Sequence, residues 1–435
     1  MEWVKPVLDV ILNQFLTKFE VMLTLVVTLG YVLLRRPAAR VISGAIKTAV
    51  GIMILQAGSA YLTTNFRPVL DILQKSFNMK GVIIDPYAGL PAATAALKDY
   101  AGYVGYTIII AFALNILYVR FTKARAVFLT GHVMFIQSAI ATWCVKYTTG
   151  LDIWPSVLIA AFLLSLYWTV FPHLLIKPTS VVIGGREAPR EEFTLGHQQM
   201  LADVLAFRFG SLFGKPEESV EKVTLPGWLA IIQDNVVATS VIMTLFVSAF
   251  MLAAGPAAVQ AQAGAQHWFI YMLFMGLRFA VAIAIILSGV RMFVSELVSS
   301  FKGVSEKLLP GAVAAIDCPA VFPFAPKAVT LGFICTVIGQ VIGIATLILS
   351  GSPIMIIPGF VPLFFDGGPV GVYANASGGW RATVVCCMLL GFVHIWGARL
   401  VIPVTGMVGG WIGNFDWSTM WSAVFWGLKA IFGGI

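Results

Sequence analysis

Two histidine-containing motifs contain side chains that could bind a polar molecule. His132 follows Thr130 and Gly131 inside an otherwise apolar segment, and His197 is followed by two glutamines, Gln198 and Gln199. An imidazole can donate and accept hydrogen bonds near neutral pH, and the two amides add directed donors and acceptors. These groups suit a polar or anionic substrate. For His132, a structural histidine whose hydrogen bonds are satisfied within a helix bundle fits the sequence equally well.

Two aspartates could add acceptors to the same site. Asp85 and Asp317 each precede a proline-containing turn, and their carboxylates could accept hydrogen bonds from substrate hydroxyls. The alternative is helix capping, in which the carboxylate satisfies amides at the start of a half-helix. The two roles are compatible.

Other chemistry finds little support in the sequence. It contains no Walker, Rossmann, H-E-x-x-H or nucleophile-elbow motif, and its five cysteines lack the spacing of metal ligands. We therefore expect no cofactor, no metal site and no catalytic residue in this chain alone.

The elements that must position these residues are membrane-spanning helices. Of 435 residues, 59% are hydrophobic and 11% are charged, which is more apolar surface than a water-soluble fold can cover. A helix needs about 20 mainly apolar residues to cross a bilayer, and the chain contains about eleven such runs. We predict an all-α polytopic membrane protein of about eleven transmembrane helices.

The net charge of +8 is explained by topology. The basic residues gather at the ends of apolar runs, where loops on the cytoplasmic side of a membrane carry an excess of Lys and Arg. We therefore expect membrane lipid and no nucleic acid as a partner, with the amino terminus outside and the carboxyl terminus inside.

Short internal similarities predict a repeat. Ile84-Asp85-Pro86 is similar to Ile316-Asp317-Cys318-Pro319, Thr130-Gly131 to Ser350-Gly351, and the run from Trp154 to Pro178 to the run from Trp380 to Pro403. Their common order suggests two inverted five-span repeats whose broken helices meet around a polar cavity. The predicted boundaries are 1–185 for the first repeat, 186–226 for a cytoplasmic connecting segment, 227–415 for the second repeat and 416–435 for a terminal transmembrane helix.

Longer motifs resemble a known family. Leu129-Thr130-Gly131-His132-Val133-Met134-Phe135, Gly196-His197-Gln198-Gln199, Gly289-Val290-Arg291-Met292-Phe293 and Leu309-Pro310-Gly311-Ala312-Val313 occur in this order. Together they resemble the ascorbate-specific permease (IIC) component of the bacterial phosphoenolpyruvate-dependent phosphotransferase system, and the similarity runs over nearly the whole chain.

The resemblance implies a homodimeric, multi-pass transporter of the bacterial inner membrane. In that family, V-motif and core domains move relative to one another to alternate access. The imported L-ascorbate is phosphorylated by a separate IIB component, whose cysteine carries a phosphoryl group received from IIA. The chain would then be the translocation subunit of a phosphotransferase complex, and whether it counts as an enzyme stays open.

The resemblance also implies a set of substrate-binding residues. They are Pro86, Tyr87, His132, Val133, Met134, Phe135, Ile136, His197, Gln198 and Asp317. Pro86 and Ile136 stand where the family tends to have polar residues, so a related acidic or polyhydroxylated compound stays open beside L-ascorbate. An ion-coupled secondary transporter that releases unmodified substrate is the alternative function.

Overall fold

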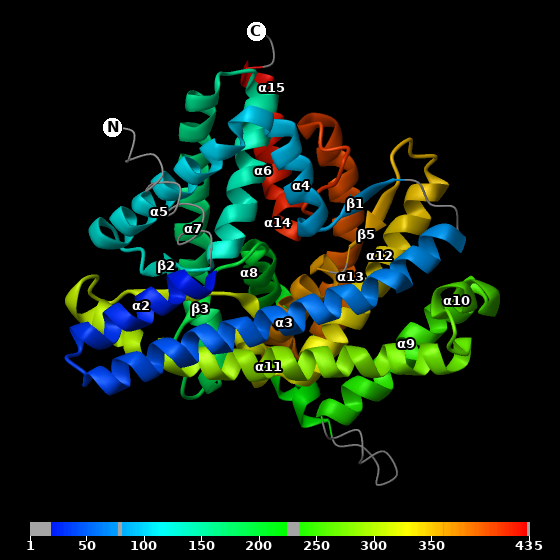
Figure 1. Ribbon diagram of the computed structural model, residues 1–435, viewed down its shortest axis with the longest axis horizontal. Helices are drawn as coiled ribbons and strands as arrows, with labels where there is room; N and C mark the ends of the chain where they lie inside the picture. Colours follow the sequence, from blue (N-terminus) through cyan, green and yellow to red (C-terminus); the bar gives the residue numbers. More distant parts are fainter. Residues whose placement is uncertain (1–18, 77–80, 224–234, 360, 433–435) are drawn as a thin grey trace.

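The computed structural model describes residues 19–76, 81–223, 235–359 and 361–432 (Figure 1). It is mostly helical, because a helix satisfies its own backbone groups where hydrocarbon offers no water. Six helical segments among these residues are long and apolar enough to cross a membrane: Ala38–Gly58, Ala88–Phe121, Ile153–Gly184, Trp268–Lys307, Pro326–Leu349 and Pro362–Thr405. The multi-pass membrane class is thus confirmed, whereas the count of about eleven spans stays a prediction.

One layer consists of long helices packed along one another. It contains α2 (Phe19–Leu33), α3 (Ala38–Ser76), α9 (Asn235–Ala254), α10 (Pro256–Ala263) and α11 (Trp268–Lys307) (Figure 1). The backbones of α3 and α11 come close at a pair of glycines, where a Cβ on Gly289 would lie 2.5 Å from the carbonyl oxygen of Gly51. Small residues allow such close helix packing in membranes.

The remaining helices form the body that carries the histidine motifs. In its first half these are α4 (Pro86–Leu97), η2 (Lys98–Tyr103), α5 (Val104–Phe121), α6 (Gly131–Thr149) and α7 (Ile153–Gly184), followed by α8 (Met200–Phe209), η3 (Gly210–Leu212), η4 (Pro216–Glu218) and η5 (Val220–Lys222). Later in the chain come η7 (Cys318–Phe324), α12 (Pro326–Leu349), η8 (Pro362–Asp366), α13 (Gly367–Thr405), α14 (Phe415–Ser418) and α15 (Met420–Phe432).

A glycine pair bends α13 into two arms. Gly378 and Gly379 have non-helical backbone angles, and Gly379 has a φ of +67°. A Cβ at Gly379 would lie 2.5 Å from the carbonyl oxygen of Lys215, so the connecting segment packs directly against the bend. Arg186 also donates to the carbonyl of Ala376 at this bend. The described part of the segment that follows α7, up to residue 223, is therefore folded onto the helices.

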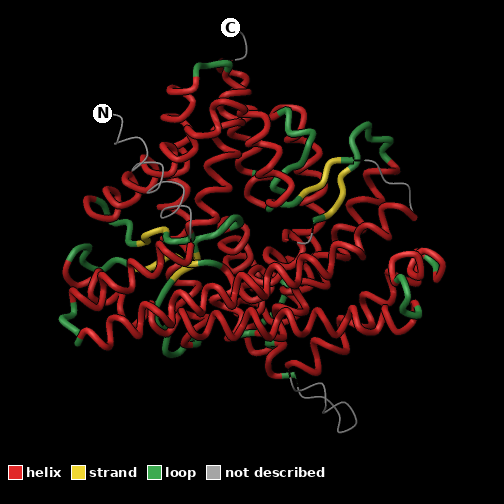
Figure 2. Tube along the Cα trace, in the orientation of Figure 1, coloured by secondary structure: helices red, strands yellow, loops and turns green. Residues whose placement is uncertain are grey.

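In the described part of the chain, five short strands lie among the helices (Figure 2). β1 (Val82–Ile84) pairs in parallel with β5 (Ile356–Pro358), and β4 (Val313–Ile316) lies between β2 (Ala126–Phe128) and β3 (Thr194–Leu195), also in parallel. The prediction of an all-α fold omitted these strands, because segments of two to four residues show no periodicity. In both sheets, a strand from the first half of the chain pairs with one from the second.

The edge of β2 is closed by a side chain. Asn115 on α5 accepts a hydrogen bond from the backbone nitrogen of Phe128 and donates to the carbonyl of Ala126. These bonds satisfy backbone groups that an edge strand in an apolar environment would otherwise leave unpaired. The short strand can therefore persist among membrane helices.

One of the predicted internal similarities is wrong in its placement. Thr130 directly precedes the start of α6, whereas Ser350 directly follows the end of α12. By element order, the residues after β5 stand where Leu129–His132 stand after β2. The similarity between Asp85 and Asp317 agrees with the structure, since each directly follows a strand. The inverted repeats themselves stay a prediction.

Candidate substrate-binding site

Parallel strands bring the two histidine motifs and Asp317 together. His132 follows β2, His197 follows β3 and Asp317 follows β4, and these three strands form one parallel sheet. The carboxyl ends of parallel strands lie at the same edge of a sheet, which is where ligands bind in many parallel folds. The sheet thus collects three segments that are far apart in the chain.

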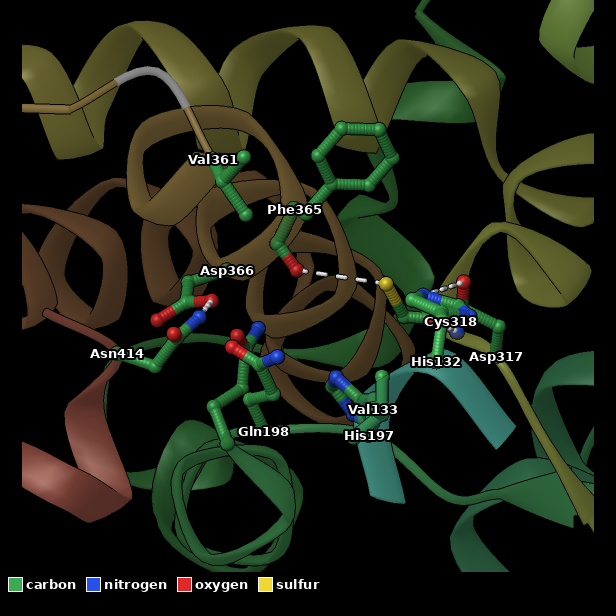
Figure 3. Close-up of a pocket in the computed structure, with 11 residues that line it drawn as sticks. His132, Val133, His197, Gln198, Asp317, Cys318, Val361, Phe365, Asp366 and Asn414 are labelled. Atoms are coloured by element: carbon green, nitrogen blue, oxygen red, sulfur yellow. Dashed lines mark hydrogen bonds and ion pairs between the residues drawn. The ribbon is translucent and has the colours of Figure 1, made fainter. Parts of the chain in front are cut away.

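A cavity of about 70 Å³ lies at this edge (Figure 3). A single buried water needs roughly 10–15 Å³ of such volume, so the cavity has room for several waters or a small polar group. The residues that line it are His132, Val133, His197, Gln198, Gln199, Asp317, Cys318, Val361, Phe365, Asp366 and Asn414. They come from the start of α6, the loop before α8, the junction of β4 and η7, the turn η8 with the residue before it, and the loop before α14.

His132 and Asp317 form an open pair at the cavity. Nε2 of His132 lies 3.5 Å from Oδ2 of Asp317, and the side chains are 36% and 13% exposed. The other carboxylate oxygen of Asp317 accepts a hydrogen bond of 2.8 Å from the backbone nitrogen of Cys318. Asp317 therefore caps η7 and also faces the cavity, so capping does not exclude a place in the site.

His197 is held in a closed pair. Its Nε2 lies 2.6 Å from Oδ2 of Asp203, and both side chains are almost fully buried. Both residues lie outside the six apolar helices. Burial disfavours the imidazolium, but the Asp203 carboxylate outweighs it and raises the pKa of His197 above its ordinary value. Burial raises the pKa of Asp203 to about 6, with His197 opposing the shift.

The backbone next to His197 is fixed by a glutamine. Nε2 of Gln137 donates to the carbonyl oxygen of His197 at 3.1 Å, and Oε1 of Gln137 accepts from Nε1 of Trp168 at 2.6 Å. Gln137 is fully buried on α6. The helix that begins with His132 thus also positions the loop that carries His197.

A second carboxylate lies in the cavity wall. Asp366 is fully buried and ends the π-helical turn η8. It accepts hydrogen bonds from Nδ2 of Asn414 and from the backbone nitrogen of Phe415, and it pairs with Nε2 of His394 at 3.0 Å. Our sequence reasoning missed this cluster. The signal was an acidic residue within an apolar run, since such residues are costly in a membrane and often functional.

A family model described as "PTS system sugar-specific permease component" matches residues 14–418. The chain belongs to this family. The "Ascorbate-specific PTS system EIIC component" of Mycoplasma pneumoniae is 30% identical over 434 residues, which cover 89% of this chain and 65% of that relative. The chain thus spans less than two thirds of the length of the curated relative. Both comparisons confirm the family resemblance drawn from the motifs.

Five of the ten predicted binding residues line the cavity: His132, Val133, His197, Gln198 and Asp317. Only the first turn of α6 reaches it, since successive residues on a helix point in different directions.

Four of the other predicted residues are not among the described residues that line the cavity. Met134 and Ile136 are buried in the core, Phe135 packs against it, and Pro86 is buried at the start of α4. The side chain of Tyr87 lies outside the described part of the structure. Roles for these five residues in binding stay predictions. Asp85 accepts a hydrogen bond from the backbone nitrogen of Val361 at 3.1 Å, as the capping alternative expects.

Among the described residues, no cluster of three or more His, Cys, Asp or Glu side chains suits a metal ion. The cavity instead combines imidazoles, carboxylates and amides. Such a set can hold a small polar molecule by hydrogen bonds and can bind an anion through a protonated imidazole.

Proposed function

We propose that this permease imports L-ascorbate, or a related acidic sugar derivative, for concomitant phosphorylation by a separate IIB component. The observation that carries the proposal is a polar cavity lined by His132, His197 and Asp317 in a member of a sugar-specific permease family. The relative's printed specificity for ascorbate supports the choice of substrate.

In this proposal each end of the substrate has a defined partner. His132, His197 and nearby amides hold the enediol of the monoanionic substrate, because imidazoles can donate hydrogen bonds and carry positive charge. Asp317 accepts a hydrogen bond from a hydroxyl group. The terminal hydroxyl faces the cytoplasmic opening, where the phosphocysteine of IIB, recharged by IIA, transfers its phosphoryl group to the hydroxyl oxygen.

The proposal includes a homodimer in the bacterial inner membrane. The V-motif domain corresponds to the layer of α2, α3 and α9–α11, and the core domain to the remaining helices. Ile42, Ile46, Val50 and Met53 are exposed along one face of α3, a surface suited to lipid or to a second copy. Motion of the core relative to the V-motif layer would alternate access to the cavity.

Inverted repeats are part of the same proposal. The first strand of each half, β1 or β4, pairs with the second strand of the other half, β5 or β2. Two repeats related by a two-fold axis would produce such crosswise pairing. The asymmetry of the cavity then arises from His197, which lies on the segment between the halves.

Uptake into proteoliposomes tests the function. With phosphorylated IIB inside the vesicles, labelled L-ascorbate should accumulate as a phosphate ester, and without IIB accumulation should be lost. IIB whose phosphocysteine is replaced by serine is the matched control. Accumulation of free ascorbate that depends on an ion gradient and not on IIB would instead establish the ion-coupled alternative.

A further inference from the structure

The cavity has two chemically different ends. In Figure 3, His132, His197 and Asp317 lie together at one end, and Asp366 and Asn414 lie at the other. The proposed function assigns the first end to the acidic part of the substrate. The second end has no assigned role.

Asp366 has one acceptor position left for a ligand. A carboxylate offers about four acceptor positions. Oδ2 accepts from the backbone nitrogen of Phe415 and lies 3.0 Å from Nε2 of His394. Within the described part of the chain, the hydrogen bond to Oδ1 comes from Nδ2 of Asn414 alone. Because Asp366 lines the cavity, the remaining position on Oδ1 is available to a bound hydrogen-bond donor.

His394 keeps Asp366 in place as an acceptor. Nε2 of Gln340 lies 3.0 Å from Nδ1 of His394. With the amide donating to Nδ1, the proton of the neutral imidazole lies on Nε2, the nitrogen that lies 3.0 Å from Oδ2 of Asp366. His394, Asp366 and Gln340 are all almost fully buried, so this orientation is shielded from water.

Two amides that line the cavity also offer polar atoms without partners. Asn414 must turn Nδ2 toward the carboxylate, which leaves Oδ1 buried with no hydrogen-bond partner in the described ranges. Both polar atoms of Gln199 are likewise unpartnered there, although Gln199 is fully buried and lines the cavity. Buried polar atoms in native proteins are normally satisfied by protein, water or ligand.

We propose that Asp366, Asn414 and Gln199 form a second subsite, which binds a neutral hydroxyl of the substrate. Acceptors outnumber donors among these groups, so the subsite favours a hydrogen-bond donor and disfavours an anion. On the proposed function, the ligand is the secondary hydroxyl on the side chain of L-ascorbate, beside the terminal hydroxyl that receives the phosphoryl group. This subsite would separate hydroxylated sugar acids from acids of similar size that lack the side-chain hydroxyl.

Equilibrium binding of two ligands tests the subsite. The ligands are L-ascorbate and its 5-deoxy analogue, measured on the purified full-length permease. The wild type should bind L-ascorbate about ten- to a hundredfold more tightly, the range typical for a hydrogen bond to a charged group. Asp366→Asn should reduce this preference to within about threefold, mainly by weakening the binding of L-ascorbate. Gln199→Met, which breaks no internal hydrogen bond in the described structure, should reduce it in part.

Asp416→Asn is the matched control. Asp416 is equally buried and accepts from Tyr167 and from the backbone of Leu201 and Ala202, but it does not line the cavity. It should leave the ratio of the two affinities unchanged.

Three results would overturn the subsite: no preference in the wild type, a preference retained by both cavity variants, or equal weakening of both ligands by Asp366→Asn. If the wild type does not bind L-ascorbate at all, the proposed function fails. The same binding measurements are then made with a panel of hexitols. Hexitol binding that both cavity variants weaken then supports the subsite, and absence of any hexitol binding overturns it.

Discussion

His132–Asp317 and His197–Asp203 are the same pair of residue types in different surroundings. The first pair is separated by 3.5 Å and His132 is 36% exposed, whereas the second is separated by 2.6 Å and is almost fully buried. An exposed, loosely paired imidazole can exchange its partner for a ligand at little cost. A buried pair loses much more when one partner is removed, because the other charge stays buried. Replacement of His132 and replacement of His197 should therefore change the stability of the protein by different amounts, even if both side chains contact the substrate.

The largest effect should come from His197→Ala. This change leaves the fully buried Asp203 without its imidazole partner, and breaking a buried pair typically costs about 3–5 kcal/mol. Uptake and thermal stability in detergent should both fall sharply. Asp203→Asn in the same chain removes the buried charge and should restore part of the stability but not the uptake. If His197→Ala is as stable as the wild type, the two pairs do not differ in their contribution to stability.

His132→Ala should affect uptake but hardly change thermal stability. Because the side chain is partly exposed and its ion pair is long, the loss of stability should stay within about 0.5 kcal/mol. Uptake should be abolished, since the imidazole faces the cavity. Thermal unfolding and proteoliposome uptake of the same preparation test this pairing of results. Normal uptake would exclude His132 from the site.

Gln137→Leu should lower both uptake and thermal stability, but each by less than His197→Ala does. It removes the donor to the carbonyl of His197 and the acceptor for Trp168, and leaving these buried groups unpaired costs about 1–3 kcal/mol. The loop that carries His197 should then lose its fixed position, so the affinity for substrate should fall while uptake stays measurable. Gln137→Glu, which keeps the acceptor for Trp168 but not the donor, should retain part of the stability. Unchanged affinity in Gln137→Leu would show that the loop is held by other contacts.

The buried pair of Asp366 and His394 shows what sequence reasoning did not reach. Asp366 lies at the end of η8, and His394 lies on the second arm of α13, beyond the bend at Gly378 and Gly379. Their spacing in the chain indicates no contact. The bend brings the two side chains together, and Gln340 on α12 completes the cluster. Local periodicity does not report such contacts, because they depend on how separate helices pack.

The sequence by itself determined the membrane class, the family and the two histidine motifs. These features follow from local properties that can be read directly from the sequence: the length of apolar runs, the distribution of charge and the order of residues within a motif. Only the tertiary structure decided which side chains share the cavity. The parallel pairing of β2, β3 and β4 brings His132, His197 and Asp317 together. The packing of α6 buries the side chains of Met134 and Ile136 in the core. The tertiary structure also placed Thr130 at the start of α6 and Ser350 at the end of α12. These outcomes depend on pairing and packing between segments that are distant in the chain, because strands this short are stable only with such partners.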